Sequence, residues 1–446
     1  MNVTMELALA AACLVTGMAW GETAKFGAVV GYWQFNEAPY KVDSSVFAND
    51  LTTFASGVAG ASGTGFAENG YDGSAYLDIT TAKAKATATL TTTLDTSKAY
   101  TYMLRIKPKD VSLSGYGALD DEIVKLLDTL KDGSKWHFAA FRYEPDQKMN
   151  ANFKRMIFTD PTYGDRYGKG GDGAATDGTR AEASIDDDSS VYFPVNVSGS
   201  SLSIGGEVGA SGKFIVTITK KADFKGAIDE VMVINRALSK HEFTRYYHAC
   251  EWPYVYTLGN VKFTAAGNWS SSEGSLAYAP SDLPGADFIV DNGCTVTADA
   301  ASFGGGSLTL GRLTALKSKV DGTQMATEIG NLVQSTANVT IGDLRLNCGK
   351  ITGAAGRTLT ATKLTVNATE ENPYEINVAS GTYAVTGTAT GDGWLKKTGA
   401  GTLDLTGLTG AAKVVVTEGK VLAGPNVTVT YDLEEDRGAV PVLMAE

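Results

Sequence analysis

The sequence is poor in cysteine, in histidine and in positive charge. Its 446 residues include 4 Cys and 3 His, and 38 Lys and Arg stand against 50 Asp and Glu, for a net charge of -12. No basic run occurs in the chain, and phosphate binding requires clustered Lys and Arg. We therefore expect no nucleic-acid partner and no binding to an anionic membrane surface.

The few cysteines exclude two further classes of protein. No two of them have the C-x-x-C spacing of a metal site. After residue 21 only Cys250, Cys294 and Cys348 remain, and an odd number cannot pair completely. A Cys294–Cys348 bridge stays open, but the chain is not a small fold held together by disulfides.

Apolar runs long enough to span a bilayer are absent beyond the N-terminus. Leu7–Val15 is apolar and is followed by small residues at alternate positions from 17 to 21, which is typical of a signal peptide over residues 1–21. The pattern departs from the usual one because Glu6, and no Lys or Arg, precedes it. A buried N-terminal helix and a lipid anchor at Cys13 are the alternatives. We expect a secreted or cell-surface protein with no transmembrane segment in its mature chain.

What the chain does have is glycine, 51 residues of it, together with much threonine, alanine and valine. This composition favours an all-β fold with many turns, and the length suggests two or three domains. The composition changes near Pro253: residues 22–253 carry all three His and most aromatic residues, whereas residues 254–446 carry no His. We predict one domain over each of these two ranges.

Short β-branched and aromatic runs, separated by Gly- and Asp-rich turns, predict a β-sandwich over residues 22–253. Apolar residues recur at helical spacing within Asp120–Lys131, which predicts an amphipathic helix there. Ser239 and Glu242 have the S-x-x-E spacing of a capping box, which predicts a second, short helix. The nine predicted strands are Val29–Phe35, Ala75–Ile79, Ala86–Leu94, Thr101–Ile106, Trp136–Tyr143, Met156–Thr159, Val191–Val195, Ser201–Ile204 and Ala227–Ile234.

Residues 254–446 contain a repeat of about twenty residues. Leu344, Leu364, Val385 and Leu405 head comparable strand pieces, separated by 20, 21 and 20 residues. Gly or Asn stands at the expected corners, and inward and outward residues alternate between them. This period predicts a β-solenoid, in which each coil buries its inward residues against the next coil.

Six motifs are spread over the first region: Gly31–Glu37 (GYWQFNE), Asp43–Asp50 (DSSVFAND), Tyr71–Leu77 (YDGSAYL), Lys135–Ala139 (KWHFA), Leu202–Gly206 (LSIGG) and Gly226–Ser239 (GAIDEVMVINRALS). In these motifs the region resembles the laminin-G-like family of concanavalin-type jelly rolls. The resemblance covers the whole region, and its main departures are Val46, where the family's turn usually has Gly, and inserts around 120–131 and 163–190. It implies a jelly-roll β-sandwich that binds glycans or proteins.

The second region contains Gly393–Leu403 (GWLKKTGAGTL), which follows a G-x-L-x-K-x-G-x-G-T-L pattern, and Gly267-Asn268-Trp269 near its beginning. In these motifs it resembles extracellular bacterial β-helices, including autotransporter-associated repeats, and the second motif is similar to the start of such a helix. The resemblance implies a right-handed parallel β-helix with coils of about twenty residues over 254–446. The fold we expect for the whole chain is therefore all-β, a jelly-roll sandwich followed by a β-helix.

Two adjacent carboxylates, Asp229 and Glu230, lie in the middle of an apolar predicted strand. Glucanases of concanavalin-type fold use an E-x-D-x-x-E pattern, and the chemistry requires two carboxylates about 5 Å apart in one cleft. Adjacent residues on a strand point to opposite faces, and Ala227 and Met232 stand where the pattern needs Glu. No Ser-His-Asp or Cys-His motif is present either. We expect no catalytic residue, and we predict that the protein is not an enzyme.

Glu37, Asp43 and Asp229 are the candidate metal ligands. First and last strands of jelly rolls commonly pair, which would bring Glu37 and the turn at Asp43 near Asp229. Oxygen ligands from a turn and a strand suit calcium, and some members of the resembling family hold a structural calcium in this way. We expect Ca2+ at this place; the alternative is that Asp229 caps or ion-pairs with a neighbouring turn.

Tyr163, Tyr167 and Tyr192 flank the Gly- and Asp-rich insert and are the candidate ligand-binding residues. Sugar-binding sandwiches stack sugar rings on Trp or Tyr, and Asn and Asp bind the hydroxyl groups. The alternative is that each tyrosine covers the sandwich core.

The sequence therefore predicts a secreted or surface-exposed, non-catalytic binding or adhesion protein. Its laminin-G-like domain would recognise a glycan or an extracellular or surface protein, and its β-helix would serve as a stalk. Two alternatives stay open: an ancillary or active module of polysaccharide degradation, similar to a glycoside hydrolase, and a structural cell-surface scaffold.

Overall fold

The structure is a computed structural model of all 446 residues. The residues it describes are 25–36, 40–54, 67–68, 75–81, 84–92, 94–95, 97–108, 133–145, 155–159, 182–184, 195–198, 200–205, 225–249, 251–270, 278–318 and 322–432. They form two compact units. The first unit holds the described residues from Ala28 to Leu238, and the second holds Lys25–Gly27 and those from Ser239 onward. Within the described ranges, no helix is long and apolar enough to cross a membrane.

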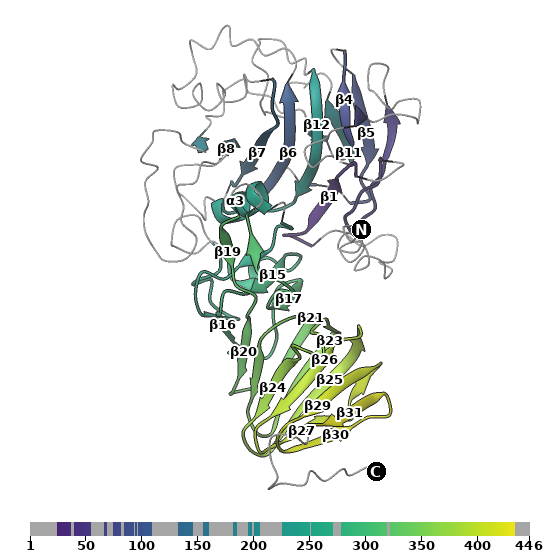
Figure 1. The fold of residues 1–446 in the computed structure, drawn as a ribbon. Helices are drawn as coiled ribbons and strands as arrows, with labels where there is room; N and C mark the ends of the chain where they lie inside the picture. Colours follow the sequence, from purple (N-terminus) through teal and green to yellow (C-terminus); the bar gives the residue numbers. More distant parts are fainter. Residues whose placement is uncertain are drawn as a thin grey trace. The chain divides into compact units, whose positions relative to one another are not determined.

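The first unit consists of two antiparallel sheets (Figure 1). In the larger sheet the first strand of the unit, β1, pairs with the last, β12, as the sequence led us to expect. The larger sheet has the order β3 (Ala67–Glu68), β4 (Ala75–Ile79), β12 (Gly226–Ile234), β6 (Tyr100–Pro108), β7 (His137–Tyr143), β8 (Arg155–Thr159) and β9 (Glu182–Ser184), and β1 (Val29–Trp33) joins it at β12. The smaller sheet has the order β10 (Val195–Ser198), β11 (Ser201–Gly205), β5 (Lys85–Thr89) and β2 (Leu51–Phe54).

Both sheets contribute side chains to one apolar core. Leu77, Leu104 and Ile228 come from the larger sheet, and Ala86 and Leu202 from the smaller; all are fully buried. The nine predicted strands correspond to observed ones except at Val191–Val195, where β10 begins at Val195 and residues 191–194 lie outside the described ranges. The predicted helix at 120–131 also lies outside them.

The second unit is β-helix-like, because the chain alternates between two long parallel sheets (Figure 1). A short hairpin, β18 (Leu316–Lys317) with β19 (Gln324–Ala326), interrupts the alternation. One sheet contains β13 (Val255–Tyr256), β15 (Asp287–Val290), β17 (Ser307–Leu310), β21 (Val339–Leu346), β23 (Arg357–Val366), β25 (Thr382–Thr390), β27 (Thr402–Leu405) and β30 (Lys420–Ala423), with β28 (Leu408–Thr409) beside β25. The other contains β14 (Val261–Lys262), β16 (Thr295–Thr297), β20 (Asn331–Gln334), β22 (Lys350–Gly353), β24 (Tyr374–Val378), β26 (Trp394–Thr398), β29 (Ala412–Val416) and β31 (Val427–Tyr431).

The predicted repeat is correct for its first pair and wrong for its second. Leu344 pairs with Leu364 across β21 and β23. Leu364, however, pairs with Ala389, and Val385 pairs with Leu359 instead. The physical reason is the connection from β23 to β24, residues 367–373, which is longer than the connection 347–349 one coil earlier. This longer corner shifts the phase of the next coil, so equal spacing along the chain does not mean equal position in the coil.

Glycines hold the corners of the second unit because the backbones of successive coils approach closely there. A Cβ added at Gly330 would lie 1.9 Å from the carbonyl oxygen of Val290, and one at Gly349 would lie 2.0 Å from the carbonyl oxygen of Gly330. Gly349 also has a φ of +138°, which side-chain-bearing residues rarely adopt. At these corners no residue larger than glycine fits without movement of the backbone.

The capping box predicted at Ser239 is confirmed. The helix α3 (Lys240–Ala249) begins directly after it. The Glu242 carboxylate accepts a hydrogen bond from the Ser239 amide at 2.9 Å, and the Ser239 hydroxyl accepts one from the Glu242 amide at 3.3 Å. These reciprocal bonds satisfy two amides at the helix start. The helix belongs to the second unit, whose main segment starts at Ser239, before the composition change near Pro253.

Candidate functional site

Asp43, a candidate metal ligand, lies in a buried turn after β1 and organises that turn by hydrogen bonding. Its Oδ1 accepts the amides of Tyr32 and Ser45 at 2.7 and 2.8 Å. Its Oδ2 accepts the Ser45 hydroxyl and the Asn49 amide, both at 2.7 Å. Burial raises the pKa of Asp43, and these four hydrogen bonds oppose the rise. Both carboxylate oxygens are therefore engaged by the protein itself.

Asn49 extends this turn toward the sheet. Its side-chain amide donates to the carbonyl oxygen of Val30 at 2.8 Å, and its side-chain oxygen accepts the Thr91 amide at 2.6 Å. The indole of Trp33, a fully buried core residue, donates to the Asn49 carbonyl oxygen at 3.1 Å. The motif DSSVFAND thus holds the turn through its first Asp and its Asn, and both side chains are buried.

Asp229 and Glu230 do not follow the simple alternation expected for a strand. Ile228 and Val231 both belong to the sandwich core, and the pairing of β12 with β6 shifts register between Asp229 and Met232. Glu230 has a φ of +52° and its amide donates to Asp229 Oδ1 at 2.9 Å. This is a β-bulge, which places an extra residue in the strand. The expectation that the two carboxylates point to opposite faces is therefore wrong at this point.

Each of these two carboxylates is buried beside a defined neighbour. The Tyr32 hydroxyl of β1 makes a short hydrogen bond with the Glu230 carboxylate. Asp229 lies opposite Arg105 in the register of β12 and β6, and both side chains are at most 1% exposed. The Arg105 guanidinium lies 5.2 Å from the ring centroid of Phe138. Arg105 is a residue that the sequence reading missed, because nothing in the pattern of β6 marks its partner.

The remaining predicted site residues lie outside the described ranges: Glu37, Tyr163, Tyr167 and Tyr192. Within the described ranges, no group of three or more His, Cys, Asp and Glu side chains could hold a metal ion. Calcium binding by Glu37, Asp43 and Asp229 stays a prediction. Cys294 and Cys348 are free thiols, so the bridge left open by the sequence does not form.

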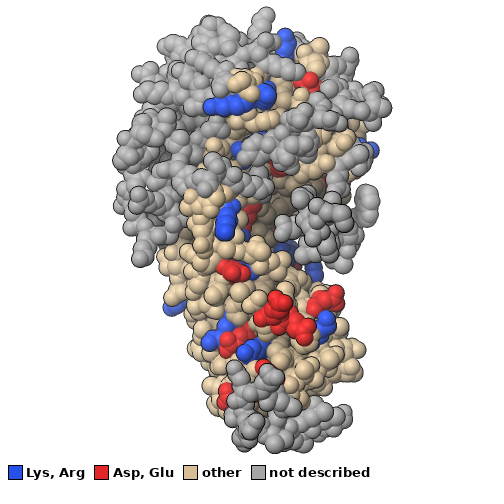
Figure 2. Space-filling model, viewed as in Figure 1, with Lys and Arg blue, Asp and Glu red and all other residues tan. Residues whose placement is uncertain are grey.

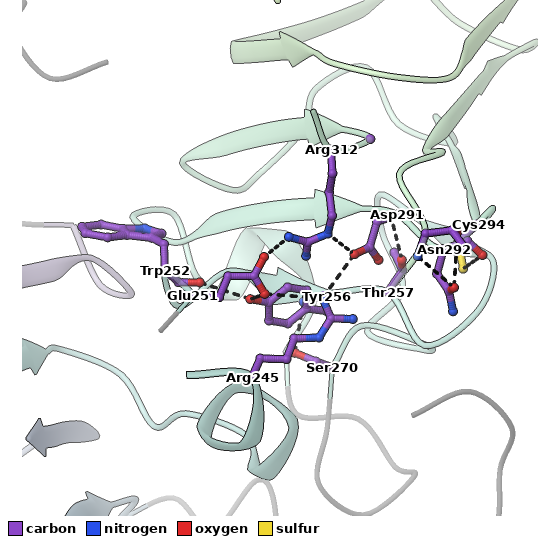
Figure 3. A network of polar contacts seen from close by, with 12 residues as sticks. Arg245, Glu251, Trp252, Tyr256, Thr257, Ser270, Asp291, Asn292, Cys294 and Arg312 are labelled. Atoms are coloured by element: carbon purple, nitrogen blue, oxygen red, sulfur yellow. Dashed lines mark hydrogen bonds and ion pairs between the residues drawn. The ribbon is translucent and has the colours of Figure 1, made fainter. Parts of the chain in front are cut away.

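The second unit contains a buried network of charges that sequence analysis did not find (Figure 3). Asp291 Oδ2 accepts Arg245 Nη1 at 3.2 Å and Arg312 Nε at 2.7 Å. Glu251 pairs with the same two guanidinium groups, with Arg245 at 3.6 Å and with Arg312 at closer range. The Arg245 guanidinium also lies over the Tyr256 ring, 3.6 Å from its centroid. Two cations and two anions therefore balance within one buried cluster.

This network connects segments that are distant in sequence. Arg245 comes from α3, Tyr256 from β13, Asp291 from the turn after β15 and Arg312 from the base of the hairpin insert. The Tyr256 hydroxyl donates to Glu251 at 2.5 Å. Removal of one charge from such a buried cluster would leave its partners uncompensated, which is strongly destabilising.

Burial shifts the pKa of two groups in or beside the network upward. Burial raises the pKa of the Tyr256 hydroxyl well above its usual value. Burial likewise raises the pKa of the Cys294 thiol, and the nearby Asp291 adds to the rise. A neutral thiol and a neutral phenol are weak nucleophiles. The arrangement supports a structural role for the cluster.

The fold and these sites define a class: an all-β protein with one antiparallel unit and one β-helix-like unit of long parallel sheets. Comparison with known proteins does not narrow the class, because no family model, no curated protein and no solved structure matches the chain. The laminin-G-like and autotransporter-repeat resemblances therefore rest on the motifs in the sequence.

Proposed function

We propose that this chain is a secreted or surface-exposed binding protein without catalytic activity. Its first unit would be a laminin-G-like jelly roll that recognises a glycan or an extracellular protein, and its second unit a right-handed β-helix that serves as a stalk. The observation that carries the proposal is the arrangement of the first unit. Two antiparallel sheets enclose one core, and the motif-bearing strands β1 and β12 pair in the larger sheet.

The stalk role is supported by the apolar column of the second unit. Inward residues from successive coils, such as Leu344, Leu364 and Leu403, are buried in one continuous cluster. Because each coil packs only on its neighbours, such a unit is stiff and its stability is a sum of local terms. A stiff spacer suits a protein that presents a binding domain.

The test is a binding screen of the full chain against glycan arrays and extracellular proteins. The triple variant Tyr163→Ala, Tyr167→Ala and Tyr192→Ala should lose at least tenfold in affinity, about 1.4 kcal/mol. Leu313→Ala is the matched control, because Leu313 is 49% exposed in the second unit. Failure of the full chain to bind any ligand would count against the proposal, and equal affinity of the triple variant would move the ligand surface elsewhere.

A second candidate function is a module of polysaccharide degradation. The observation that favours it is the bulge in β12, which removes the alternation that had argued against joint action of Asp229 and Glu230, although both carboxylates are buried. Hydrolysis of a polysaccharide panel that disappears in Asp229→Asn and Glu230→Gln would support this function. No hydrolysis by the full chain would dismiss it.

Calcium is the cofactor we propose for the first unit, with Glu37, Asp43 and Asp229 as ligands. Because both oxygens of Asp43 already accept hydrogen bonds, calcium would have to displace one of these donors. Isothermal titration of the chelator-treated chain with Ca2+ tests this, with Asp43→Asn as the variant. Absence of a heat signal would exclude the site.

A further inference from the structure

The outer face of the second parallel sheet carries a tryptophan among polar side chains. Along β26, Leu395 and Lys397 are buried, whereas Trp394, Lys396 and Thr398 are half-buried. Because side chains alternate along a strand, these last three project outward from the coil. An indole on an outer sheet face is the kind of aromatic group that ligand sites use for stacking.

Neighbouring strands place polar residues beside this row. Glu375 of β24 lies beside Lys396 and Asn377 lies beside Thr398 in the pairing of β24 with β26. Adjacent strands are about 4.8 Å apart and residues four apart in a strand span about 13 Å. The platform from Trp394 to Thr398 is therefore long enough for two or three sugar rings.

The polar groups at the far end of the row are already oriented. The Asn377 side-chain amide donates to the Thr398 hydroxyl at 2.9 Å, and that hydroxyl donates to Glu375 Oε1 at 2.7 Å. Among the described residues, the Lys396 ammonium group has no hydrogen-bond or ion-pair partner. The row thus offers acceptors that are already oriented, at low cost in side-chain entropy. Lys396 adds a donor whose side chain has to be ordered on binding.

The indole is also held in place. Lys413 lies beside Trp394 in the pairing of β26 with β29, and its Nζ is 5.6 Å from the ring centroid. The same Nζ donates to the Asp392 carbonyl oxygen at 3.2 Å. Both signs of charge surround the row: the ammonium groups of Lys350, Lys396 and Lys413 lie near the carboxylates of Glu375 and the exposed Asp392, with Lys350 Nζ 3.9 Å from Glu375 Oε1. Acidic and basic side chains also lie next to one another on the face in view in Figure 2. A neutral, hydroxyl-rich ligand suits such a surface better than a polyanion does.

We propose that this outer face binds a neutral glycan chain that runs along β26. A sugar ring stacks its C–H face on the Trp394 indole, the next ring bonds through its hydroxyl groups to Lys396 and Glu375, and a third reaches Asn377 and Thr398. This gives the second unit a binding site of its own, beyond its proposed role as a stalk. It does not depend on a ligand for the first unit.

The experiment is affinity electrophoresis of the full chain in gels that contain barley β-glucan, xyloglucan, galactomannan or amylopectin, with polygalacturonate as the anionic probe. We expect retardation by at least one neutral polymer. Trp394→Ala should weaken that retardation at least tenfold, Trp394→Phe should keep it within about threefold, and Thr398→Val should lie between them. Thr365→Ala is the matched control, because Thr365 projects from the opposite sheet on β23.

Each outcome of the electrophoresis either supports or contradicts glycan binding along β26. Retardation that is lost in Trp394→Ala and kept in Thr365→Ala, with thermal midpoints equal to that of the wild type, supports the proposal. Retardation by polygalacturonate alone, by no polymer, or equally in Trp394→Ala overturns it and leaves Trp394 as a cover for the sheet. Loss in the triple Tyr163, Tyr167 and Tyr192 variant but not in Trp394→Ala overturns it while supporting the proposed function of the first unit.

Discussion

The two units end their strands in opposite ways. In the first unit the turn after β1 is held by an added side chain, the Asp43 carboxylate, which accepts three backbone amides and a hydroxyl. In the second unit the corners at Gly330 and Gly349 depend on the lack of a side chain, because the carbonyl of another coil occupies that space. The antiparallel turn therefore needs a side chain of its own segment to accept hydrogen bonds from its backbone amides. In the stacked coils, the backbone groups of one coil form hydrogen bonds with those of the next.

Removal of the carboxylate should have the largest effect. Asp43→Ala leaves the buried amides of Tyr32, Ser45 and Asn49 without their acceptor, and each such loss costs roughly 1–3 kcal/mol. We expect a loss of about 4 kcal/mol in the free energy of unfolding, measured by urea titration. Asp404→Ala is the control: Asp404 accepts the Thr406 amide at 2.9 Å but is half-exposed, so about 0.5 kcal/mol is expected there. Equal losses of unfolding free energy in the two variants would contradict the special role of the Asp43 carboxylate in the first unit.

Addition of a methyl group at a corner should come next. Gly330→Ala drives a Cβ against the Val290 carbonyl oxygen, and we expect a loss of about 3 kcal/mol from overpacking. Gly356→Ala is the matched control, because Gly356 has a φ of +71° but no atom within 4 Å of an added Cβ. Strain alone should cost about 1 kcal/mol there. If Gly330→Ala unfolds at the wild-type urea midpoint, close backbone approach is not what the corner requires.

Lys397 is an exception among the corners of the second unit, because here a side chain forms hydrogen bonds with the corner. The fully buried ammonium donates to the carbonyl oxygens of Thr398 at 2.7 Å, of Glu418 at 3.1 Å and of Gly399. We expect Lys397→Met to lower the free energy of unfolding by about 2 kcal/mol, because three acceptors lose their donor. The measurement is urea titration at pH 7, and an unchanged midpoint would contradict it.

The same lysine should make the free energy of unfolding depend on pH. Burial lowers the pKa of Lys397 from 10.5 to about 8, and Glu418 opposes this shift. Between about pH 8 and 10.5 the unfolded chain therefore binds more protons at this position than the folded one, so stability rises with pH in that window. Relative to Lys397→Met, the wild type should gain stability across this window in urea titrations. A constant difference between the two proteins would refute the shift.

The smallest loss of stability should follow from removal of a hydrogen bond between two asparagine side chains at the corners of neighbouring coils. The Asn367 side-chain amide donates to the Asn347 side-chain oxygen at 3.0 Å, one coil away. We expect Asn367→Ala to cost about 1 kcal/mol, since the bond is half-buried and neutral. The control is Thr365→Val, whose hydroxyl pair with Thr390 is exposed and should contribute less than about 0.5 kcal/mol. A thermal shift assay with both variants orders the two losses.

Local signals were enough to predict much of the fold. The S-x-x-E spacing placed the start of α3, because both partners of a capping box lie within four residues. The strand runs Ala75–Ile79 and Ala227–Ile234 were found through alternation and β-branched residues, and they match β4 and β12 closely. The phase of the coil that contains Val385 was missed, because a longer corner at 367–373 leaves no mark in the hydrophobic period.

The sites were less accessible to sequence reading. Arg245, Asp291 and Arg312 come together from separate elements, and no spacing rule connects them. The bulge at Glu230 depends on a backbone conformation with positive φ. Glutamate rarely adopts this conformation, so the sequence gives no sign of it at this position. Asp43 was found, but its role in satisfying amides shows only when its partners are placed.

The parallel pairing of β25, β27 and β30 has a consequence for how such a protein can change over generations. Because successive coils meet through the same backbone bonds and glycine corners, an in-frame duplication of residues 382–401 would supply both surfaces that its neighbours need. Each added copy would move the ends of the second unit apart by about 4.8 Å. In this architecture, evolution can therefore change the length of the second unit in equal steps, because each added coil makes the same kind of contact as the coils already present.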